Sequence, residues 1–169
     1  MEYKEIYKYC PRCKADLKAE TDWYICCTQC DFYFYVNPAP CNAAILENNT
    51  GEILLVKRKY DPKKDYWDVP GGFINTNESL EESMTREIKE ELGIELSEFA
   101  YFASFSDRYM YKNIHYYTLG VVFIGKVGDQ FLTPHDDVAE VKFFKKNQIP
   151  FDLIAFPSVQ KALKLYLKK

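Results

Sequence analysis

Residues 72–94 place the strongest constraint on how this chain can fold. Four apolar side chains recur there at intervals of four residues: Leu80, Met84, Ile88 and Leu92. This spacing puts them on one side of an α-helix, and Gly93 directly after the last of them favours the end of that helix. The pattern predicts a helix over residues 79–92 that packs an apolar stripe against a sheet.

The predicted helix carries a cluster of carboxylates on a neighbouring face. Glu87, Glu90 and Glu91 have i, i+3 and i+4 spacing, so their side chains lie close together. Like charges beside an apolar stripe repel one another and lose solvation, whereas a divalent cation makes the cluster favourable. Oxygen ligands of this kind select Mg²⁺ or Mn²⁺. These residues alone leave a metal site and a solvated, glutamate-rich helix open.

The whole segment resembles a known family motif, the Nudix box, G-x5-E-x7-R-E-U-x-E-E-x-G-U, where U is a bulky aliphatic residue. All of its defined positions match: Gly72, Glu78, Arg86, Glu87, Ile88, Glu90, Glu91, Gly93 and Ile94. Seven fixed identities at frequencies of about 6–7% each coincide by chance on the order of 10⁻⁸ to 10⁻⁹ per starting position. The resemblance therefore outweighs the solvated-helix interpretation.

Membership of the Nudix family would imply an α/β fold, an α/β/α sandwich with a mixed β-sheet. Nudix hydrolases use Mg²⁺ or Mn²⁺ to add water across a phosphoanhydride in a nucleoside diphosphate linked to another moiety. By this resemblance the metal ligands are three carboxylates and one backbone carbonyl: Glu87, Glu90, Glu91 and Gly71. Glu78 and Arg86 would organise the loop and helix. The expected general base is Glu90 or Glu91, and Glu140 is the next candidate and a further possible metal ligand.

Five of the six cysteines lie within the first thirty residues. They include two Cys-x2-Cys pairs, formed by Cys10 with Cys13 and by Cys27 with Cys30. Two such pairs on facing turns make a tetrahedral sulfur site for zinc. A segment of this length buries too little to fold alone, whereas structural zinc contributes roughly 10–16 kcal/mol. We expect a small β zinc ribbon; Cys27 fits the spacing better than the adjacent Cys26, and reduced, unligated cysteines are the alternative.

The remaining sequence predicts a β-rich domain. Runs rich in β-branched and aromatic residues predict strands at 41–47, 52–58, 99–107, 114–127 and 138–144, and an amphipathic pattern predicts a closing helix at 158–168. We therefore expect two domains, a zinc ribbon at 1–37 and a Nudix hydrolase domain at 38–169.

Composition limits the possible partners. The chain has 22 Lys and Arg against 25 Asp and Glu, a formal charge of -3, which argues against broad binding to polyanions. Charges of both signs alternate in the ribbon, so nucleic acid is an unlikely partner there, although a zinc ribbon can bind it. No apolar run has the length of a signal peptide or a membrane span, so we expect a cytoplasmic protein without a membrane partner. Family resemblance makes a homodimer reasonable.

A zinc ribbon followed by a Nudix domain is similar to the NADH pyrophosphatase branch of the family, but the S-Q-P-W-P-F-P-x-S motif of that branch is absent after the box. ADP-ribose, an NADH-like dinucleotide and a modified nucleoside triphosphate are the candidate substrates. Side chains able to stack on a base or pair with a phosphate are Arg58, Phe105, Arg108, Tyr109, Tyr111 and Phe156. A nucleotide-sensing regulatory module and a hydrolase that removes a cap from RNA are the alternative functions.

Overall fold

A computed structural model describes residues 2–96, 98–128 and 130–169. The chain divides into two compact units, each described by itself below. The larger unit comprises Pro40–Asp107 and Leu119–Lys169, and the smaller comprises Met1–Ala39 and Arg108–Thr118. Among the helices of the described residues, none is long and apolar enough to cross a membrane.

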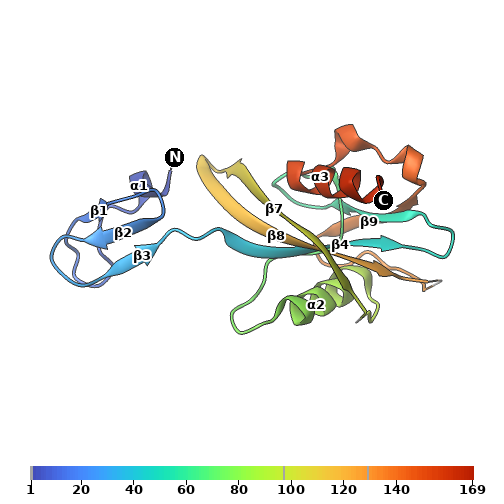
Figure 1. Cartoon of the computed structure of the whole chain (residues 1–169), viewed down its shortest axis with the longest axis horizontal. Coiled ribbons are helices and arrows are strands. Elements are labelled where there is room, and N and C mark those ends of the chain that lie inside the picture. The colour runs from blue at the N-terminus through green and yellow to red at the C-terminus, as the bar shows by residue number, and fades with distance from the viewer. Residues whose placement is uncertain (1, 97, 129) are drawn as a thin grey trace. The chain divides into compact units, whose positions relative to one another are not determined.

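The larger unit is built on a six-stranded sheet (Figure 1). Its strands are β4 (Ala39–Glu47), β5 (Ile53–Arg58), β6 (Trp67–Asp68), β7 (Ala100–Tyr111), β8 (Ile114–Lys126) and β9 (Val138–Phe144). Neighbours follow the order β6, β5, β4, β8 and β7, and β9 pairs with β5. Strands β5 and β9 are antiparallel, with Leu55 opposite Lys142, whereas the arrows of β4 and β8 point the same way in both ribbon views. The sheet is therefore mixed, as expected.

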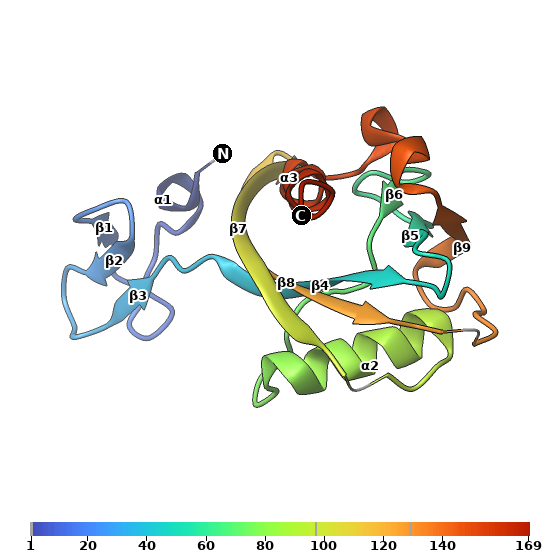
Figure 2. The same ribbon diagram turned by 45° about the vertical axis from the view of Figure 1, so that its right-hand side comes forward.

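Helices cover both faces of this sheet, with α2 (Leu80–Leu92) on one side and α3 (Pro157–Tyr166) on the other (Figure 2). Successive strand residues point to opposite faces. Accordingly, Leu46 of β4 belongs to the core cluster that includes Met84 and Ile88 of α2, whereas Ile45 belongs to the cluster that includes Leu163 of α3. This layering confirms the predicted α/β/α sandwich.

Helix α2 begins and ends close to where the sequence predicts. Ser79 and Glu82 cap its start reciprocally: the Ser79 hydroxyl accepts from the Glu82 N–H at 3.2 Å, and the Glu82 carboxylate accepts from the Ser79 N–H at 2.8 Å. Such a cap is worth about 1 kcal/mol. Gly93 ends the helix in the left-handed conformation, φ 70°. The cap and the buried stripe together fix how the glutamates of α2 are presented.

Some elements differ from the prediction. Strand β7 extends to Tyr111 because Lys112 and Asn113, with φ of 47° and 63°, make a two-residue turn that leads directly into β8. The short helices α1 (Tyr3–Ile6), η1 (Lys146–Gln148) and η2 (Phe151–Leu153) were not expected. Each spans four residues or fewer, too few to show a helical or strand period in the sequence.

The smaller unit contains a three-stranded antiparallel sheet of β1 (Leu17–Ala19), β2 (Tyr24–Cys27) and β3 (Tyr33–Tyr35). Ile25 is its buried centre, with 2% of its surface exposed. This small sheet with its cysteines fits the predicted ribbon. The unit also takes in the end of the β7–β8 hairpin, residues 108–118, which the sequence did not associate with it.

Candidate functional site

Arg86 is the central polar residue of α2. Its guanidinium binds both carboxylate oxygens of Glu78, with Nε–Oε1 2.7 Å and Nη2–Oε2 3.0 Å, and Nη2 also donates to the Phe73 carbonyl at 3.1 Å. These hydrogen bonds from Arg86 lower the pKa of Glu78 to about 2. Arg86 thus ties the loop before α2 to the helix, the organising role that the family motif implies.

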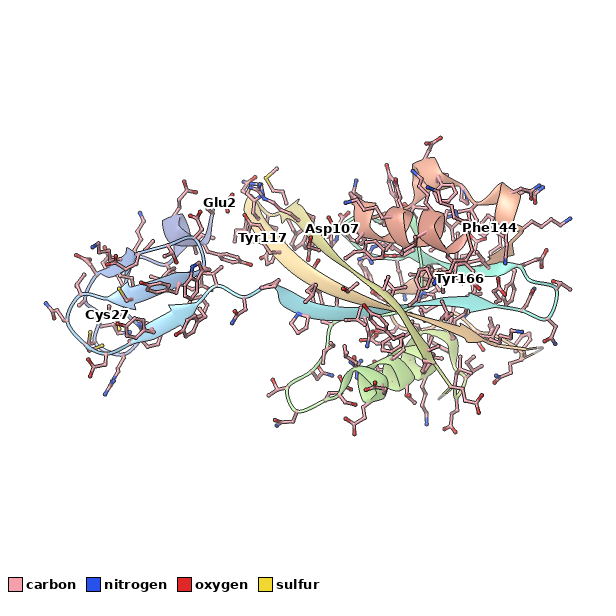
Figure 3. The ribbon with its side chains drawn as sticks, viewed as in Figure 1. Glu2, Cys27, Asp107, Tyr117, Phe144 and Tyr166 are labelled. Atoms are coloured by element: carbon pink, nitrogen blue, oxygen red, sulfur yellow. The ribbon has the colours of Figure 1, made fainter. Side chains whose placement is uncertain are left out.

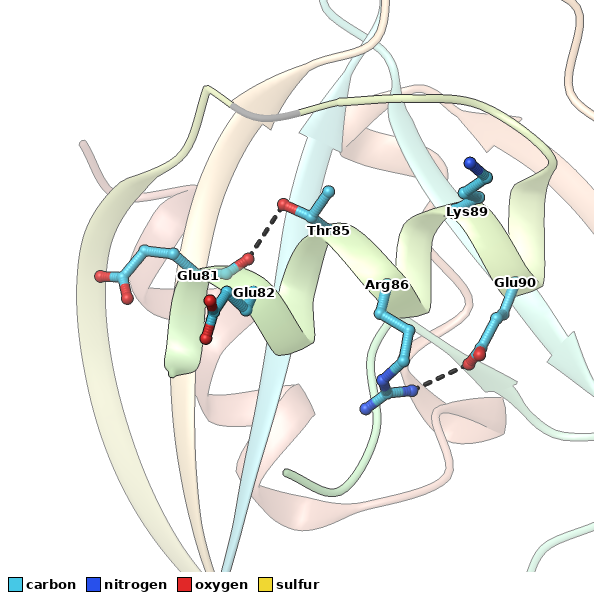
Figure 4. Close-up of a pocket in the computed structure, with 6 residues that line it drawn as sticks. All are labelled: Glu81, Glu82, Thr85, Arg86, Lys89 and Glu90. Carbon is cyan, nitrogen blue, oxygen red and sulfur yellow. Dashed lines mark hydrogen bonds and ion pairs between the residues drawn. The ribbon is translucent and has the colours of Figure 1, made fainter. Parts of the chain in front are cut away.

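The same guanidinium also reaches two other box glutamates. Nη1 of Arg86 lies 2.8 Å from Oε1 of Glu87 and 2.8 Å from Oε2 of Glu90. The second pair spans one turn of α2 and lies in a groove along its outer side (Figure 4). The groove, called here the outer groove of α2, is lined by Glu81, Glu82, Thr85, Arg86, Lys89 and Glu90. The Glu90 side chain is 47% exposed, so water reaches its carboxylate.

Glu91 faces inward instead. Only 5% of its surface is exposed, and Oε2 accepts a hydrogen bond from the Gly71 N–H at 3.1 Å. Burial raises the pKa of Glu91 well above its ordinary value, and the nearby charge of Asp137 adds to this shift. Burial also raises the pKa of Glu87. The positive charge near Glu91 and Glu87 is therefore too small to offset the cost of burying their carboxylates.

Two glycines let the backbone approach these carboxylates. Gly71 has φ 143°, and a Cβ there would lie 2.3 Å from the Asn42 carbonyl oxygen. A Cβ on Gly72 would lie 2.4 Å from Oε1 of Glu87. A side chain at Gly71 would therefore collide with the backbone of β4, whereas one at Gly72 would displace the Glu87 carboxylate.

Gly72→Ala is expected to displace the Glu87 carboxylate, because the added methyl group occupies its place. A displacement of about 1 Å in such a site costs about 10²-fold in rate, so we expect a loss of that order in kcat/KM with the fold retained. Gly120→Ala is the control, since its Cβ would meet only ordinary contacts at 3.5 Å or more. Equal activity of the two variants would show that Glu87 does not need its present position.

Two further acidic residues, Asp68 and Asp137, lie beside Glu91, and Asp68 was not considered as a site residue from the sequence. Asp68, 8% exposed, pairs with Arg58 at 3.3 Å, and burial raises its pKa to about 6. Asp68, Asp137, Gly71 and Glu91 line one small cavity. The sequence signal that could have identified Asp68 is its position between Trp67 and Val69 in a short apolar segment. Carboxylates are rarely buried among apolar residues without a functional or pairing role.

Glu140, the predicted alternative base, lies on β9. It stands opposite Lys57 of β5, and its carboxylate pairs with the Lys57 ammonium at 3.3 Å. Asp137 lies three residues before Glu140 in the sequence. Its negative charge contributes to the raised pKa of Glu91 and of Glu87. Of these two acids, Asp137 is therefore the one whose charge acts on the buried box carboxylates.

The predicted substrate-binding residues fall into both units. Arg58 and Phe156 come together in the larger unit, with the guanidinium 5.1 Å from the ring centre. Phe105 packs against the core beneath α3. Residues of the β7–β8 hairpin end, Arg108, Tyr109 and Tyr111, belong to the smaller unit.

The box residues fit a hard divalent cation by the chemistry of their donors. Their carboxylates are gathered on one helix, and burial and mutual repulsion raise the pKa of Glu91 and Glu87, a cost that a cation removes. In the present arrangement Glu87 and Glu90 pair with Arg86, and Glu91 takes the Gly71 N–H. The three side chains thus lie at neighbouring positions of α2, and their carboxylates face different partners.

The four predicted zinc ligands do converge. The sulfur atoms of Cys10, Cys13, Cys27 and Cys30 all lie within 4.8 Å of one another, close enough to share one metal ion. The Cys27 sulfur also accepts from the N–H of Gln29 at 3.3 Å and of Cys30 at 3.4 Å. Cys26 turns away, with its thiol 3.6 Å from the Lys18 carbonyl. Four sulfurs in this arrangement fit zinc.

The sequence family described as the NUDIX domain matches residues 38–164. This chain belongs to the Nudix family. It is a Nudix hydrolase, and its complete box lies on the loop and helix described above. The Nudix assignment made from the box residues is therefore confirmed.

Individual Nudix proteins resemble this chain to different extents. The ADP-ribose pyrophosphatase of Methanocaldococcus jannaschii is 34% identical over 137 residues, which cover 81% of this chain and 78% of that protein. The NAD-capped RNA hydrolase NudC of Shigella flexneri is 28% identical over 104 residues, 61% of this chain but only 40% of NudC. A NUDIX hydrolase structure from Nitrosomonas europaea superposes with TM-score 0.65 and 26% identity, covering 95% of this chain and 90% of that chain.

Proposed function

We propose that this Nudix hydrolase cleaves the phosphoanhydride bond of ADP-ribose or of a closely related nucleoside diphosphate linked to another moiety, with Mg²⁺ or Mn²⁺. The proposal rests on the complete Nudix box, in which the buried carboxylate of Glu91 and the half-exposed carboxylate of Glu90 lie on one helix. The choice of substrate is supported by the relative named ADP-ribose pyrophosphatase, which matches this chain over 78% of its own length.

The residues that would hold the divalent ion are Glu87, Glu90, Glu91 and the Gly71 carbonyl. When bound, the ion neutralises charge on the diphosphate and polarises the bond to be broken. Asp68 and Asp137 line the same small cavity as Glu91, and their negative charges add to the charge that such an ion would neutralise.

Glu90 is the proposed general base. Its carboxylate is half-exposed in the outer groove of α2, within reach of water, and Arg86 fixes its direction. In the reaction a water oxygen attacks phosphorus, its proton passes to Glu90, and the bond to the bridging oxygen breaks. The leaving phosphate retains the electron pair of that bond. Such catalysis consists largely of positioning and charge neutralisation.

A substrate panel tests this function. ADP-ribose, NADH, a modified nucleoside triphosphate and NAD-capped RNA are incubated with the protein and Mg²⁺ or Mn²⁺, and products are separated by chromatography. We expect the highest kcat/KM for ADP-ribose, with AMP and ribose 5-phosphate as products. Binding without hydrolysis of any of these compounds would favour a nucleotide-sensing module.

Removal of a nucleotide cap from RNA is the second candidate. The NudC relative is named for that activity, but the match spans less than half of NudC. The panel separates the two functions, because a cap-removing enzyme would prefer NAD-capped RNA to free ADP-ribose.

We further propose that residues 1–37 form a zinc ribbon on Cys10, Cys13, Cys27 and Cys30, and that residues 38–169 form the catalytic domain. The convergence of the four sulfurs supports the ribbon. A homodimer is also proposed, by resemblance to the family. Light scattering would give a mass near twice 19.9 kDa for the dimer.

A further inference from the structure

One face of the β7–β8 hairpin end carries three polar side chains. The two-residue turn at Lys112 and Asn113 places Arg108 of β7 opposite Tyr117 of β8, with His115 diagonal to Arg108 on the same face. The Arg108 guanidinium lies 5.5 Å from the centre of the Tyr117 ring, and its Nε donates to His115 Nδ1 at 3.1 Å. The imidazole thus fixes the direction of the guanidinium.

These side chains converge on one carboxylate from the same unit. Oε2 of Glu2 accepts a hydrogen bond from the Tyr117 hydroxyl at 2.8 Å, and Oε1 pairs with Nη2 of Arg108. Figure 3 shows Glu2 beside Tyr117 at the hairpin end. The hairpin face therefore presents a guanidinium and a hydroxyl to an oxyanion, with an imidazole holding the guanidinium in place.

Glu2 is a weakly held ligand for this face. Its side chain is 34% exposed and that of Arg108 is 50% exposed, and ion pairs with such access to water are weak because water and salt screen them. The segment that carries Glu2 is also short, since α1 has four residues. An external anion with stronger hydrogen bonding would therefore compete with Glu2 effectively.

A phosphate group has the chemistry to do so. It carries more charge than a carboxylate and offers three acceptor oxygens, and a guanidinium binds it through two parallel hydrogen bonds. We propose that Arg108 and Tyr117, oriented by His115, form a phosphate-binding site of this protein, and that Glu2 occupies the site until a phosphate displaces it. The inference that a nucleotide carries this phosphate rests on the proposed function. The inference that the site binds phosphate does not depend on it.

Nuclear magnetic resonance titrations on the full chain test the proposal. Inorganic phosphate and AMP are the two probes, and the resonances of His115 and Tyr117 locate the binding. An internal competitor raises the apparent Kd, so we expect Glu2→Gln to bind phosphate about two- to fivefold more tightly than wild type, as the loss of a weak competitor allows. Arg108→Lys should weaken binding about tenfold, because lysine cannot make the two parallel hydrogen bonds.

Glu5→Gln is the matched control, since it removes one negative charge from α1, and no contact of Glu5 with Arg108 or Tyr117 is seen among the described residues. The Glu5 carboxylate accepts a hydrogen bond from the Glu2 N–H at 2.7 Å, which the amide oxygen of glutamine can also accept. An equal effect of Glu2→Gln and Glu5→Gln would overturn the proposal, as would phosphate shifts confined to other resonances. Tightening for both probes supports a site for phosphate alone; tightening for AMP only supports a nucleotide-borne phosphate. None of these results depends on hydrolysis, so failure of the site and failure of the proposed reaction are distinguished.

Discussion

Glu90→Gln is expected to lower kcat for the best substrate by about 10²- to 10⁴-fold, the usual contribution of a general base. The amide keeps the shape of the side chain and can still accept the hydrogen bond from Arg86, but it cannot take a proton from water. Because an amide is also a weaker ligand for a divalent cation than a carboxylate, both proteins are compared at saturating Mg²⁺. Because the side chain is 47% exposed, the fold should be unaffected. Single-turnover kinetics with Mg²⁺ measures the chemical step directly.

Glu81→Gln is the matched control for this variant. Glu81 lines the outer groove of α2 beside Glu82, about two and a half helical turns from Glu90 (Figure 4), and the substitution removes the same charge. The activity of Glu81→Gln should stay within about twofold of wild type if Glu90 acts by accepting a proton. An equal loss of activity in both variants would mean that the groove affects catalysis only through its negative electrostatic potential. Glu91 would then be the candidate base.

Cys27→Ser is expected to abolish stoichiometric zinc binding and to unfold the ribbon. A structural zinc ion supplies roughly 10–16 kcal/mol in small zinc domains, far more than the burial available to so short a segment. Elemental analysis should find about one zinc per wild-type chain and much less in the variant. Trypsin should then cleave after Arg12, Lys14 or Lys18 in the variant but not in the zinc-loaded wild type.

Cys26→Ser provides the comparison for the neighbouring thiol. Its sulfur contacts the Lys18 carbonyl and lies outside the group of four, so zinc content and resistance to trypsin should match wild type. The reverse pattern, with zinc lost from Cys26→Ser and kept by Cys27→Ser, would exchange the two ligands. Full stability of both variants without zinc would refute a structural metal.

Much of the site was predictable because its parts are close in sequence. The spacing of Leu80, Met84, Ile88 and Leu92 determines which side of α2 is buried. The same helical period places the glutamates on the next face. The two Cys-x2-Cys pairs likewise identified the four sulfurs that converge.

Other parts were decided only when distant segments came together. Asp68 and Asp137 meet Glu91 because β6, the segment before β9 and α2 border one cavity, which no local pattern shows. Asp137, rather than Glu140, acts on the box carboxylates because the pairing of β9 with β5 places Glu140 against Lys57.

The sequence by itself determined the family, the buried side of α2 and the four cysteines, because helical period and short spacings depend on neighbouring residues. Only the tertiary structure decided the surroundings of those residues: the charge beside Glu91, the pairing of Glu140 with Lys57 and the contact of Glu2 with the hairpin. Such contacts depend on strand order and on which side chains share a buried space, and both are properties of the folded chain.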